Sequence, residues 1–409
     1  MRIRTFQGLV PSPGKHADIA SVPYDVVNRE EAAALGDGKP ENFIHVVRAE
    51  IDLPEVEDPY SDEVYAKSRD TLERFQADGV LVREDAPAIY LYQQTMGDHT
   101  QTGIVAVSHV DDYAEDKIKK HEKTRPAKED DRTRITSELG ANTGPVFLTY
   151  EAVEEIDALV AQAVAQDKPV CQFHADDGVE HVVWKLSGER AEQIVSLFGD
   201  IPVTYVADGH HRSASAHRVG AERRAANPNH DGTEDYNYFL SVLYPGNQLK
   251  ILPYNRAIHD LNGLTEDALL EGIRAAGFEI TADASPAPSE AGSCSMFLGG
   301  AWHQISWAAD PSADVVARLD VSVLQDRILT PLLGIDDPRT SNRIDFVGGI
   351  RGTAELERLV EEGRAAVCFA VHPVSVEELM AIADAGQIMA PKCTWFEPKL
   401  RSGLFVHTF

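Results

Sequence analysis

Short apolar runs bounded by turn residues recur along the first two thirds of the chain and predict strands. Residues 88–95 and 101–110 form two such runs on either side of Gly97 and Asp98, which predicts a hairpin. Between residues 60 and 80, apolar positions recur at helical spacing among charged residues, which predicts an amphipathic helix. The chain therefore begins as a mixture of helices and strands.

The middle of the chain continues this mixture. Further strands are predicted at residues 144–150, in a hairpin over residues 170–186, and at residues 201–207 and 237–246. Helices are predicted at residues 153–167 and after residue 207, where the helix should end near Asn227 and Pro228.

The C-terminal third predicts helices near residues 264–276 and 354–363, a strand pair around Gly299 and Gly300, and a final strand at residues 404–409. The fold class is therefore α/β (α+β), with mixed sheets and flanking helices. We expect three parts. Residues 1–150 form an N-terminal α/β domain, residues 151–262 pack with it as one core, and residues 263–409 form a C-terminal α/β domain.

Composition and charge narrow the classes of function. The 409 residues are 43% hydrophobic and 25% charged, and no run approaches the roughly 18 apolar residues of a membrane span. The N-terminus has no apolar signal segment, so we expect a cytoplasmic protein without a membrane partner. A formal charge of −28 repels nucleic acid. Four scattered cysteines without a CxxC pair predict neither a disulfide framework nor a zinc knuckle. Nothing here predicts the oligomeric state.

The segment "VADGHHRSAS", residues 206–215, carries an apolar strand into a helix made of small residues. A helix N-terminus preceded by glycine offers free backbone N–H groups to an anion. The residues in this segment that we expect to bind phosphate are Gly209, His210, His211, Arg212 and Ser213. His211 is also a candidate for proton transfer, and Asp208 is a candidate helix N-cap, acceptor of the hydroxyl proton or Mg²⁺ ligand. The alternative is a capped helix with two histidines facing solvent.

A zinc site is the less favoured explanation of the two adjacent histidines. Neighbouring side chains point in different directions, and no histidine or cysteine lies at ligand spacing from them. We therefore expect no stoichiometric zinc, and Mg²⁺ as the metal that accompanies a nucleotide.

Residues 117–134 concentrate positive charge, with eight Lys and Arg against four acids. Five residues of this basic segment are candidates to line an anion site: His121, Lys123, Arg125, Lys128 and Arg132. Glu122 and Asp131 would then orient these cations or bind Mg²⁺. The alternative is a solvated charged face.

Two further stretches carry candidate chemistry. Asp25, in "SVPYDVVN", is a candidate general base or metal ligand, or else a turn former, and His45 and Arg48 are candidates for the same pocket. The C-terminal stretch of residues 391–403 combines cations and hydroxyl groups that suit phosphates, from Lys392, Thr394, Lys399 and Ser402. It suits an ordinary strand with packed aromatic residues equally well.

The "DGHHR" sequence at residues 208–212 resembles the phosphate-binding signature of the ParB/sulfiredoxin-like fold, which includes free-serine kinases. Five stretches resemble one family along nearly the whole chain, the domain of unknown function 1015: "VPYDVV", "NFIHVVRAEIDLP", "HEKTRPAKEDDR", "DGHHR" and "MAPKCTWFEPKLRSGL". This resemblance implies a ParB/sulfiredoxin-like core and nucleotide-dependent phosphoryl transfer.

The leading hypothesis is an enzyme, a phosphotransferase that uses Mg²⁺ and a nucleotide, ATP or ADP, to phosphorylate a small hydroxylated metabolite. Free serine is the acceptor that the resemblance implies. The alternative is a nucleotide-sensing or phosphate-sensing module without net catalysis. The sequence contains no GxxxxGK[ST], GxGxxG, GxSxG or HExxH motif, so P-loop, Rossmann, α/β-hydrolase and zincin chemistry are not expected.

Overall fold

The computed structural model describes residues 1–390 and 392–409, and the chain divides into two compact units. The first unit comprises Met1–Leu249 and Pro398–Phe409, and the second comprises Lys250–Glu397. The second unit is therefore inserted into the first along the chain. The boundary expected near residue 262 falls inside the second unit. Pro391, at the start of the C-terminal stretch described above, lies outside the described residues.

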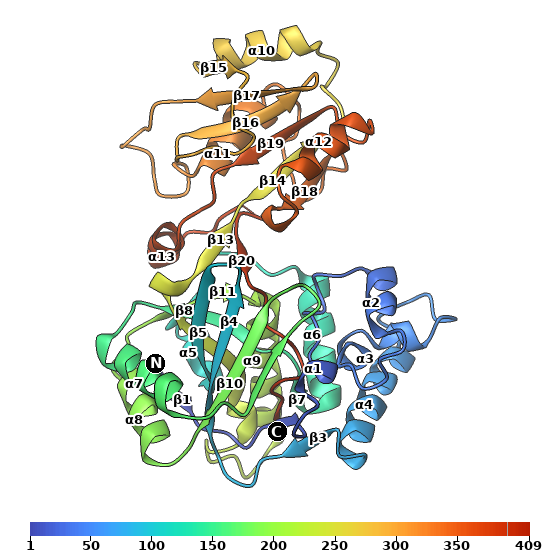
Figure 1. Ribbon diagram of the computed structural model, residues 1–409, viewed down its shortest axis with the longest axis vertical. Helices are drawn as coiled ribbons and strands as arrows, with labels where there is room; N and C mark the ends of the chain where they lie inside the picture. The colour runs from blue at the N-terminus through green and yellow to red at the C-terminus, as the bar shows by residue number, and fades with distance from the viewer. Residues whose placement is uncertain (391) are drawn as a thin grey trace. The chain divides into compact units, whose positions relative to one another are not determined.

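One large mixed sheet forms the centre of the first unit (Figure 1). Its strands follow the order β6 (Ile118–Lys119), β11 (Thr204–Asp208), β8 (Val146–Tyr150), β12 (Tyr238–Pro245), β5 (His99–His109), β4 (Ile89–Met96), β10 (Glu180–Leu186) and β9 (Cys171–His174), with β1 (Ile3–Arg4) also paired to β5. The two predicted hairpins, β4–β5 and β9–β10, are confirmed as antiparallel pairs. The mixed α/β class predicted from the sequence is confirmed.

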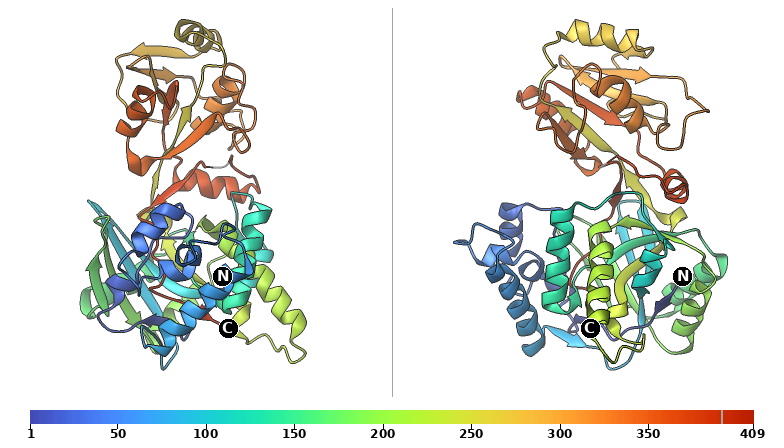
Figure 2. Two further views of the ribbon diagram at one scale, coloured as in Figure 1. Left: turned by 90° about the vertical axis from the view of Figure 1, so that its right-hand side faces the viewer. Right: turned by 180° about the vertical axis from the view of Figure 1, so that it is seen from behind.

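The helices of the first unit lie against this sheet or beside it. They are α1 (His16–Ile19), α2 (Arg29–Gly36), α3 (Ile44–Val47), α4 (Asp62–Ala77), α5 (Val110–Ala114), α6 (Pro126–Leu139), α7 (Glu154–Gln166), α8 (Glu189–Phe198) and α9 (His210–Ala226). Helices α6 and α9 pack against each other and lie side by side on one face of the sheet (Figure 2). This pair matters for function because each helix begins beside the candidate phosphate segment.

Local sequence explains where these two helices begin and end. Pro126 opens α6 at a position where no backbone N–H is needed, and Gly140 closes it in the left-handed conformation with φ of 55°. On α9, the small residues Ala214, Ser215 and Ala216 are buried, which lets this helix approach its neighbours closely.

The end of the chain completes the first unit. β21 (His407–Thr408) pairs with β7 (Ala141–Asn142), while β2 (Leu9–Pro11) pairs with β3 (Leu81–Arg83). The strand predicted over residues 404–409 is thus only two residues long. Its apolar pattern has another cause, because Leu404, Phe405 and Val406 are buried core residues, of which Val406 forms an isolated antiparallel bridge with Leu9.

The second unit has its own sheet and core. The strands of that sheet follow the order β15 (Glu279–Ala282), β17 (Ala301–Ser306), β16 (Ser293–Leu298), β19 (Val367–Val371), β14 (Tyr254–Ile258) and β18 (Ile344–Gly348). Its helices are α10 (Glu266–Ala275), α11 (Asp320–Leu324), α12 (Ala354–Glu361) and α13 (Val376–Asp384). The two ends of the unit pair with each other as β13 (Lys250–Leu252) and β20 (Trp395–Glu397).

Among the described residues, no helix combines the length and the apolar character that crossing a bilayer requires.

Candidate functional site

The predicted strand-to-helix transition is present at residues 204–226. β11 is a buried strand, and α9 begins directly after Gly209, which adopts the left-handed conformation with φ of 99°. Asp208 is not the helix N-cap, contrary to one expectation from the sequence, because Gly209, which has no side chain, takes that position. Asp208 is the last residue of β11, and its carboxylate lies beside the first turn of α9. That carboxylate instead accepts a hydrogen bond from Arg212 at 3.0 Å.

Arg212 is held in place from two sides. Besides Asp208, its guanidinium group donates to the carbonyl of Pro145, and its Nε atom is buried without a hydrogen-bond partner among the described residues. A Cβ atom at Gly209 would lie 3.1 Å from this Nε atom. Glycine therefore serves two purposes here. It permits the positive φ angle, and it leaves room for the guanidinium group against the backbone.

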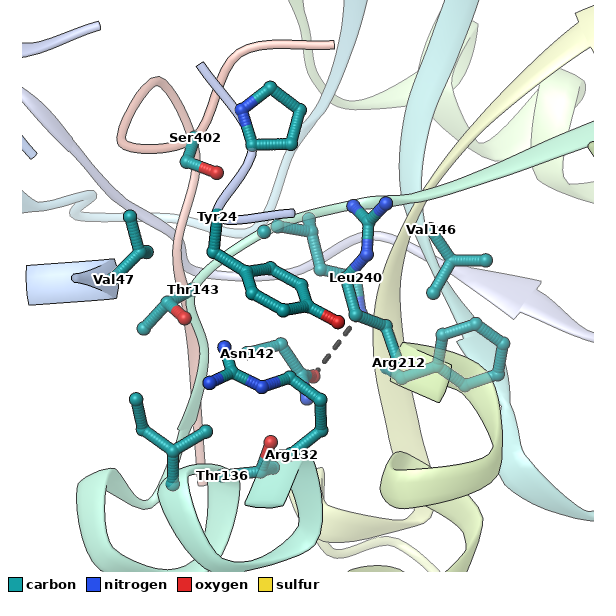
Figure 3. A pocket seen from close by; sticks show the side chains of 14 residues that line it. Tyr24, Val47, Arg132, Thr136, Asn142, Thr143, Val146, Arg212, Leu240 and Ser402 are labelled. Carbon is teal, nitrogen blue, oxygen red and sulfur yellow. Dashed lines mark hydrogen bonds between the residues drawn. The ribbon is translucent and has the colours of Figure 1, made fainter. Parts of the chain in front are cut away.

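Arg212 lines a small cavity of about 30 Å³ (Figure 3). The cavity is lined by Pro23, Tyr24, Val47, Arg132, Ile135, Thr136, Asn142, Thr143, Gly144, Val146, Arg212, Phe239, Leu240 and Ser402. The charged members of this described lining are two arginines, and hydroxyl groups of tyrosine, threonine and serine accompany them. Guanidinium and hydroxyl groups are hydrogen-bond donors for an anion. We call this cavity the arginine pocket.

Arg132 reaches the arginine pocket from α6. Its guanidinium carbon lies 3.8 Å from the centre of the Tyr24 ring, and its Nη2 atom lies 2.7 Å from Asp131. Asp131 is buried and also accepts a hydrogen bond from the hydroxyl of Tyr65 at 2.8 Å. Asp131 thus orients Arg132, which is one of the two roles expected for it from the sequence.

The loop that carries Asp25 is fixed by Arg48. The Arg48 guanidinium donates to the carbonyl of Tyr24 at 2.9 Å and to that of Val27, and it pairs with Glu50 at 2.6 Å. Arg48 is therefore not part of the described pocket lining, contrary to the expectation. It positions the loop beside the pocket, and the Asp25 side chain is exposed.

His45 is a structural histidine. Its Nδ1 atom hydrogen-bonds the Asp52 carboxylate at 2.8 Å, and its Nε2 atom faces the carbonyls of Gly36 and Lys39. With both ring nitrogens engaged away from the arginine pocket, His45 has no part in it.

His211 is half-buried next to this loop. Its Nε2 atom accepts a hydrogen bond from the backbone N–H of Arg125 at 3.0 Å, so the neutral ring carries its proton on Nδ1. Burial lowers the pKa of His211 and Arg125 lowers it further, while the negative charges of Asp25 and Glu129 oppose the shift. The ring is therefore neutral at pH 7 and offers a donor at Nδ1. Asp25 acts electrostatically on His211 and on Arg132, which brings these three predicted residues into one neighbourhood.

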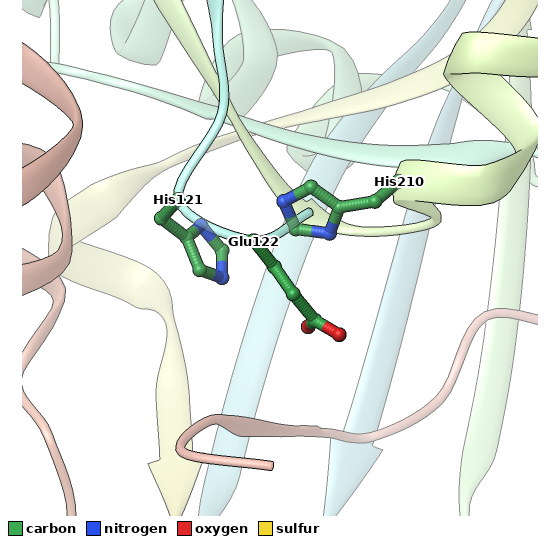
Figure 4. Close-up of side chains that lie close together, drawn as sticks. All are labelled: His121, Glu122 and His210. Carbon is green, nitrogen blue, oxygen red and sulfur yellow. The ribbon is translucent and has the colours of Figure 1, made fainter. Parts of the chain in front are cut away.

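His210 points elsewhere. It is buried rather than exposed, which contradicts the alternative of two histidines facing solvent. Its ring lies 4.5 Å from that of His121, centre to centre, with Glu122 close by (Figure 4). Burial lowers the pKa of His121 to about 4 and that of His210 well below its usual value. Residue spacing indicated no ligand partner for His210, because His121 is distant from it along the chain.

Ser213 does not offer its hydroxyl to an anion at the start of α9. The side chain is fully buried, and its Oγ atom donates to the carbonyl of His210 at 3.0 Å. This expectation was wrong because the fourth residue of the helix turns inward, toward its own first turn.

The basic segment divides between the pocket and the surface. Arg132 lines the pocket, whereas Lys123 and Arg125 have exposed side chains and Lys128 donates to the Tyr60 hydroxyl at 2.7 Å. Several other cations of the segment pair with acids, among them Lys117 with Glu115, Lys120 with Asp116 and Arg134 with Asp62. Much of the segment is therefore a solvated, ion-paired face, as its alternative interpretation proposed.

The candidate residues of the C-terminal stretch are divided between the two units. Ser402 lines the arginine pocket, and the Nζ atom of Lys399 lies 3.8 Å from the Asp208 carboxylate. Lys392 and Thr394 belong to the second unit, where Lys392 donates to the Tyr254 hydroxyl at 3.1 Å. Their contribution to a phosphate site stays a prediction.

Sequence reasoning missed the segment of residues 142–144 before β8, which lines the pocket with Asn142, Thr143 and Gly144. A Cβ atom at Gly144 would lie 3.2 Å from the Oγ atom of Ser402. The available signal was a turn sequence directly before a buried strand, where binding residues often lie.

Comparison with solved structures gives low similarity over most of the chain. A free serine kinase in complex with AMP has 14% sequence identity and a TM-score of 0.35, covering 71% of this chain and 86% of its own. A conserved hypothetical protein from Pyrococcus furiosus has 15% identity and a TM-score of 0.36, covering 73% and 93%. SbnI from Staphylococcus aureus, truncated at its C-terminus, has 13% identity and a TM-score of 0.37, covering 72% and 82%.

No curated protein matches the chain. A family model matches residues 3–322, which is most of the chain, and its description is a protein of unknown function, DUF1015. The matched region contains the loop of Asp25, the basic segment and the transition into α9, and every residue of the described pocket lining except Ser402 lies within it. The chain belongs to the DUF1015 family.

Proposed function

We propose that this protein is a phosphotransferase that moves a phosphoryl group from ATP or ADP, with Mg²⁺, to the hydroxyl group of a small metabolite. Free serine is the acceptor to test first. The arginine pocket carries this proposal, because two nearly buried guanidinium groups and several hydroxyl groups converge on one cavity. The side chains of Arg132 and Arg212 are 11% and 12% exposed.

Burial strengthens the attraction of these cations for an anion. Water screens an exposed arginine, whereas a buried one interacts with an anion through a lower effective dielectric constant. Within the part of the chain that the structure describes, the Nε atom of Arg212 has no hydrogen-bond partner, so a bound anion would add an interaction without breaking one there. A phosphate or carboxylate group matches the planar fork of a guanidinium group.

The size of the cavity limits what it can accept. About 30 Å³ is room for about two water molecules by the usual requirement of 10–15 Å³ each. We therefore assign to the arginine pocket one anionic group of a ligand, with the remainder of the nucleotide or metabolite lying outside the cavity.

We assign the chemistry to two residues adjacent in sequence to the pocket residues Tyr24 and Arg212, namely Asp25 and His211. The acceptor hydroxyl oxygen attacks the terminal phosphorus, the bond from that phosphorus to the bridging oxygen of the nucleotide breaks, and Asp25 accepts the hydroxyl proton. His211 donates from Nδ1 to a phosphoryl oxygen. With ADP as donor, the products are AMP and the phosphorylated metabolite.

Mg²⁺ is expected to arrive with the phosphates, which supply most of its ligands in sites of this kind. Asp208 is a weaker candidate ligand than the sequence indicated, because its carboxylate already faces Arg212 at 3.0 Å and Lys399 at 3.8 Å. Two cations at one carboxylate oppose the approach of a third.

The deciding experiment incubates the purified protein with ADP or ATP, Mg²⁺ and a mixture of amino acids that includes serine, followed by mass spectrometry. A phosphorylated amino acid, formed in proportion to nucleotide consumed, would support the phosphotransferase. Nucleotide binding without product would favour the sensing module, the second candidate. Absence of both would contradict both.

A matched pair of variants links the result to the arginine pocket. Arg132→Gln should abolish most binding of the anionic ligand, whereas Arg134→Gln, on the same helix but exposed and paired with Asp62, should leave it unchanged. Equal binding by the two variants would show that the arginine pocket is not the anion site.

A further inference from the structure

We propose that His121, Glu122 and His210 form a binding site for one divalent transition-metal ion, of which zinc is the reference case; this replaces the expectation from the sequence that the chain holds no zinc. This proposal concerns a different set of side chains from the arginine pocket, and it does not depend on the proposed phosphoryl transfer. His121 and Glu122 lie between β6 and α6, and His210 is the first residue of α9. The site would therefore join two segments that are distant in sequence.

The three side chains converge. One potential ligand atom from each lies within 4.8 Å of the others, and the two imidazole rings stand at 90° to one another (Figure 4). Zinc binds nitrogen at about 2.0–2.1 Å, which places tetrahedral ligand atoms roughly 3.3 Å apart. Side-chain rotations that move the ligand atoms by an ångström or so would bring all three to coordination distance from one ion.

The hydrogen bonding of the histidines points to a missing ligand. The side chains are 2% exposed at His121 and 6% exposed at His210. Both ring nitrogens of His121 and the Nε2 atom of His210 are buried without a hydrogen-bond partner among the described residues. A buried polar group left in this way costs about 1–3 kcal/mol, so native proteins rarely retain one without a reason.

Other buried histidines of the same unit behave differently. His181 is fully buried and bonds the Tyr92 hydroxyl at 2.7 Å through Nδ1, while its Nε2 atom accepts from Arg401 at 3.3 Å. His407 is also buried and contacts the carbonyl of Asp235 at 3.1 Å. His217 also has a buried Nδ1 atom without a partner among the described residues, but at His121 and His210 such atoms lie together beside a carboxylate.

The donor set indicates the class of metal. Imidazole nitrogen suits zinc, iron, copper and nickel, whereas Mg²⁺ and Ca²⁺ prefer oxygen ligands alone. Two imidazoles and one carboxylate leave at least one coordination position for water or substrate, as in open zinc sites. Asp208 adds negative potential, since its charge acts on both histidines.

The test uses the full chain without a polyhistidine tag. The protein is stripped with a chelator, and Zn²⁺ and Mg²⁺ are titrated separately by calorimetry without nucleotide, with elemental analysis of the dialysed product. We expect one zinc per chain and no comparable binding of Mg²⁺. Cobalt(II) substitution should give the visible absorption of a four- or five-coordinate site.

Variants assign the ligands. Glu122→Gln, at a half-buried position, and His210→Asn should each weaken zinc binding by about 100-fold or more, because each removes one of three protein ligands. His217→Asn, on the same helix but outside the cluster, should bind zinc like the unmodified chain. Glu122→Gln keeps the test meaningful if the buried His210→Asn variant fails to fold. Absence of 1:1 zinc binding, or equal affinity in Glu122→Gln and His217→Asn, would overturn the proposal.

Discussion

Asp25 illustrates how a single side chain can be free to react while its backbone is held rigidly. Arg48 fixes the carbonyls on either side of it, and the carboxylate itself is exposed near His211. We expect Asp25→Asn to lower the rate of phosphoryl transfer about 10²–10⁴-fold, the usual contribution of a general base. Nucleotide affinity should change little, because the base acts on the acceptor hydroxyl.

Single-turnover kinetics with a saturating nucleotide measures this prediction, and Asp18→Asn, at another exposed acid nearby, is the control. An unchanged rate in Asp25→Asn would remove Asp25 from the mechanism and leave the rest of the site in place.

His181 supports a prediction about pH. Burial and the neighbouring Arg401 lower its pKa to about 3, whereas the unfolded chain binds this proton near pH 6.5. The unfolded state therefore holds one more proton than the native state between these two values, and acidification through this range lowers the free energy of unfolding. The contribution is fully present above pH 6.5.

Urea unfolding at pH 7 and pH 5 measures the effect. Between these values the unmodified chain should lose about 2 kcal/mol more stability than His181→Gln, at about 1.4 kcal/mol per pH unit below pH 6.5. The comparison concerns the change with pH, so a constant loss of stability in the variant does not affect it. Parallel pH dependence would mean that His181 takes up its proton in the native state.

At the scale of elements, the strand-to-helix transition at Gly209 determines where Arg212 lies. Gly209 has φ of 99° and Gly232 has φ of 94°, but only at Gly209 would a Cβ atom meet a neighbour, the guanidinium group of Arg212. Gly209→Ala and Gly232→Ala should each lose about 1–3 kcal/mol of stability from backbone strain. Gly209→Ala alone should also weaken anion binding, by about tenfold or more, because it displaces Arg212.

Thermal unfolding and ADP titration of both variants check this prediction. Equal ADP affinity in the two variants would mean that Arg212 does not bind the ligand.

Elements with strong periodicity or clear boundary residues could be predicted from the sequence. The strand of residues 204–208 and α9 follow from an apolar run, an Asp-Gly pair and a series of small residues, all of which are local signals. The arginine pocket could be predicted only in part, since Arg132, Arg212 and Ser402 meet through tertiary contacts. The pairing of His121 with His210 left no trace in residue spacing, because two separate segments create it.

At the scale of the whole molecule, net charge affects the approach of a ligand. The formal charge of −28 repels a polyphosphate, and the exposed cations of the basic segment offset that repulsion locally. Lys123→Glu should therefore slow nucleotide association and weaken its dependence on salt. Lys168→Glu, a reversal at another exposed lysine of the first unit, should have a smaller effect.

Stopped-flow association at several salt concentrations measures both variants. Screening over about 8–10 Å at moderate ionic strength should reduce the difference between them as salt rises. Identical rates and salt slopes would mean that Lys123 belongs only to the solvated face of the basic segment.

The insertion of the second unit also has a consequence for the order of events on the ribosome. Ser402, Lys399 and the core residue Val406 are translated after the whole second unit, yet they belong to the first. At about 5–20 residues per second, the early part of the chain waits on the order of ten seconds for them. The nascent first unit lacks its C-terminal segment, residues 398–409, during that time. Completion of the arginine pocket is therefore one of the last steps in the synthesis and folding of the protein.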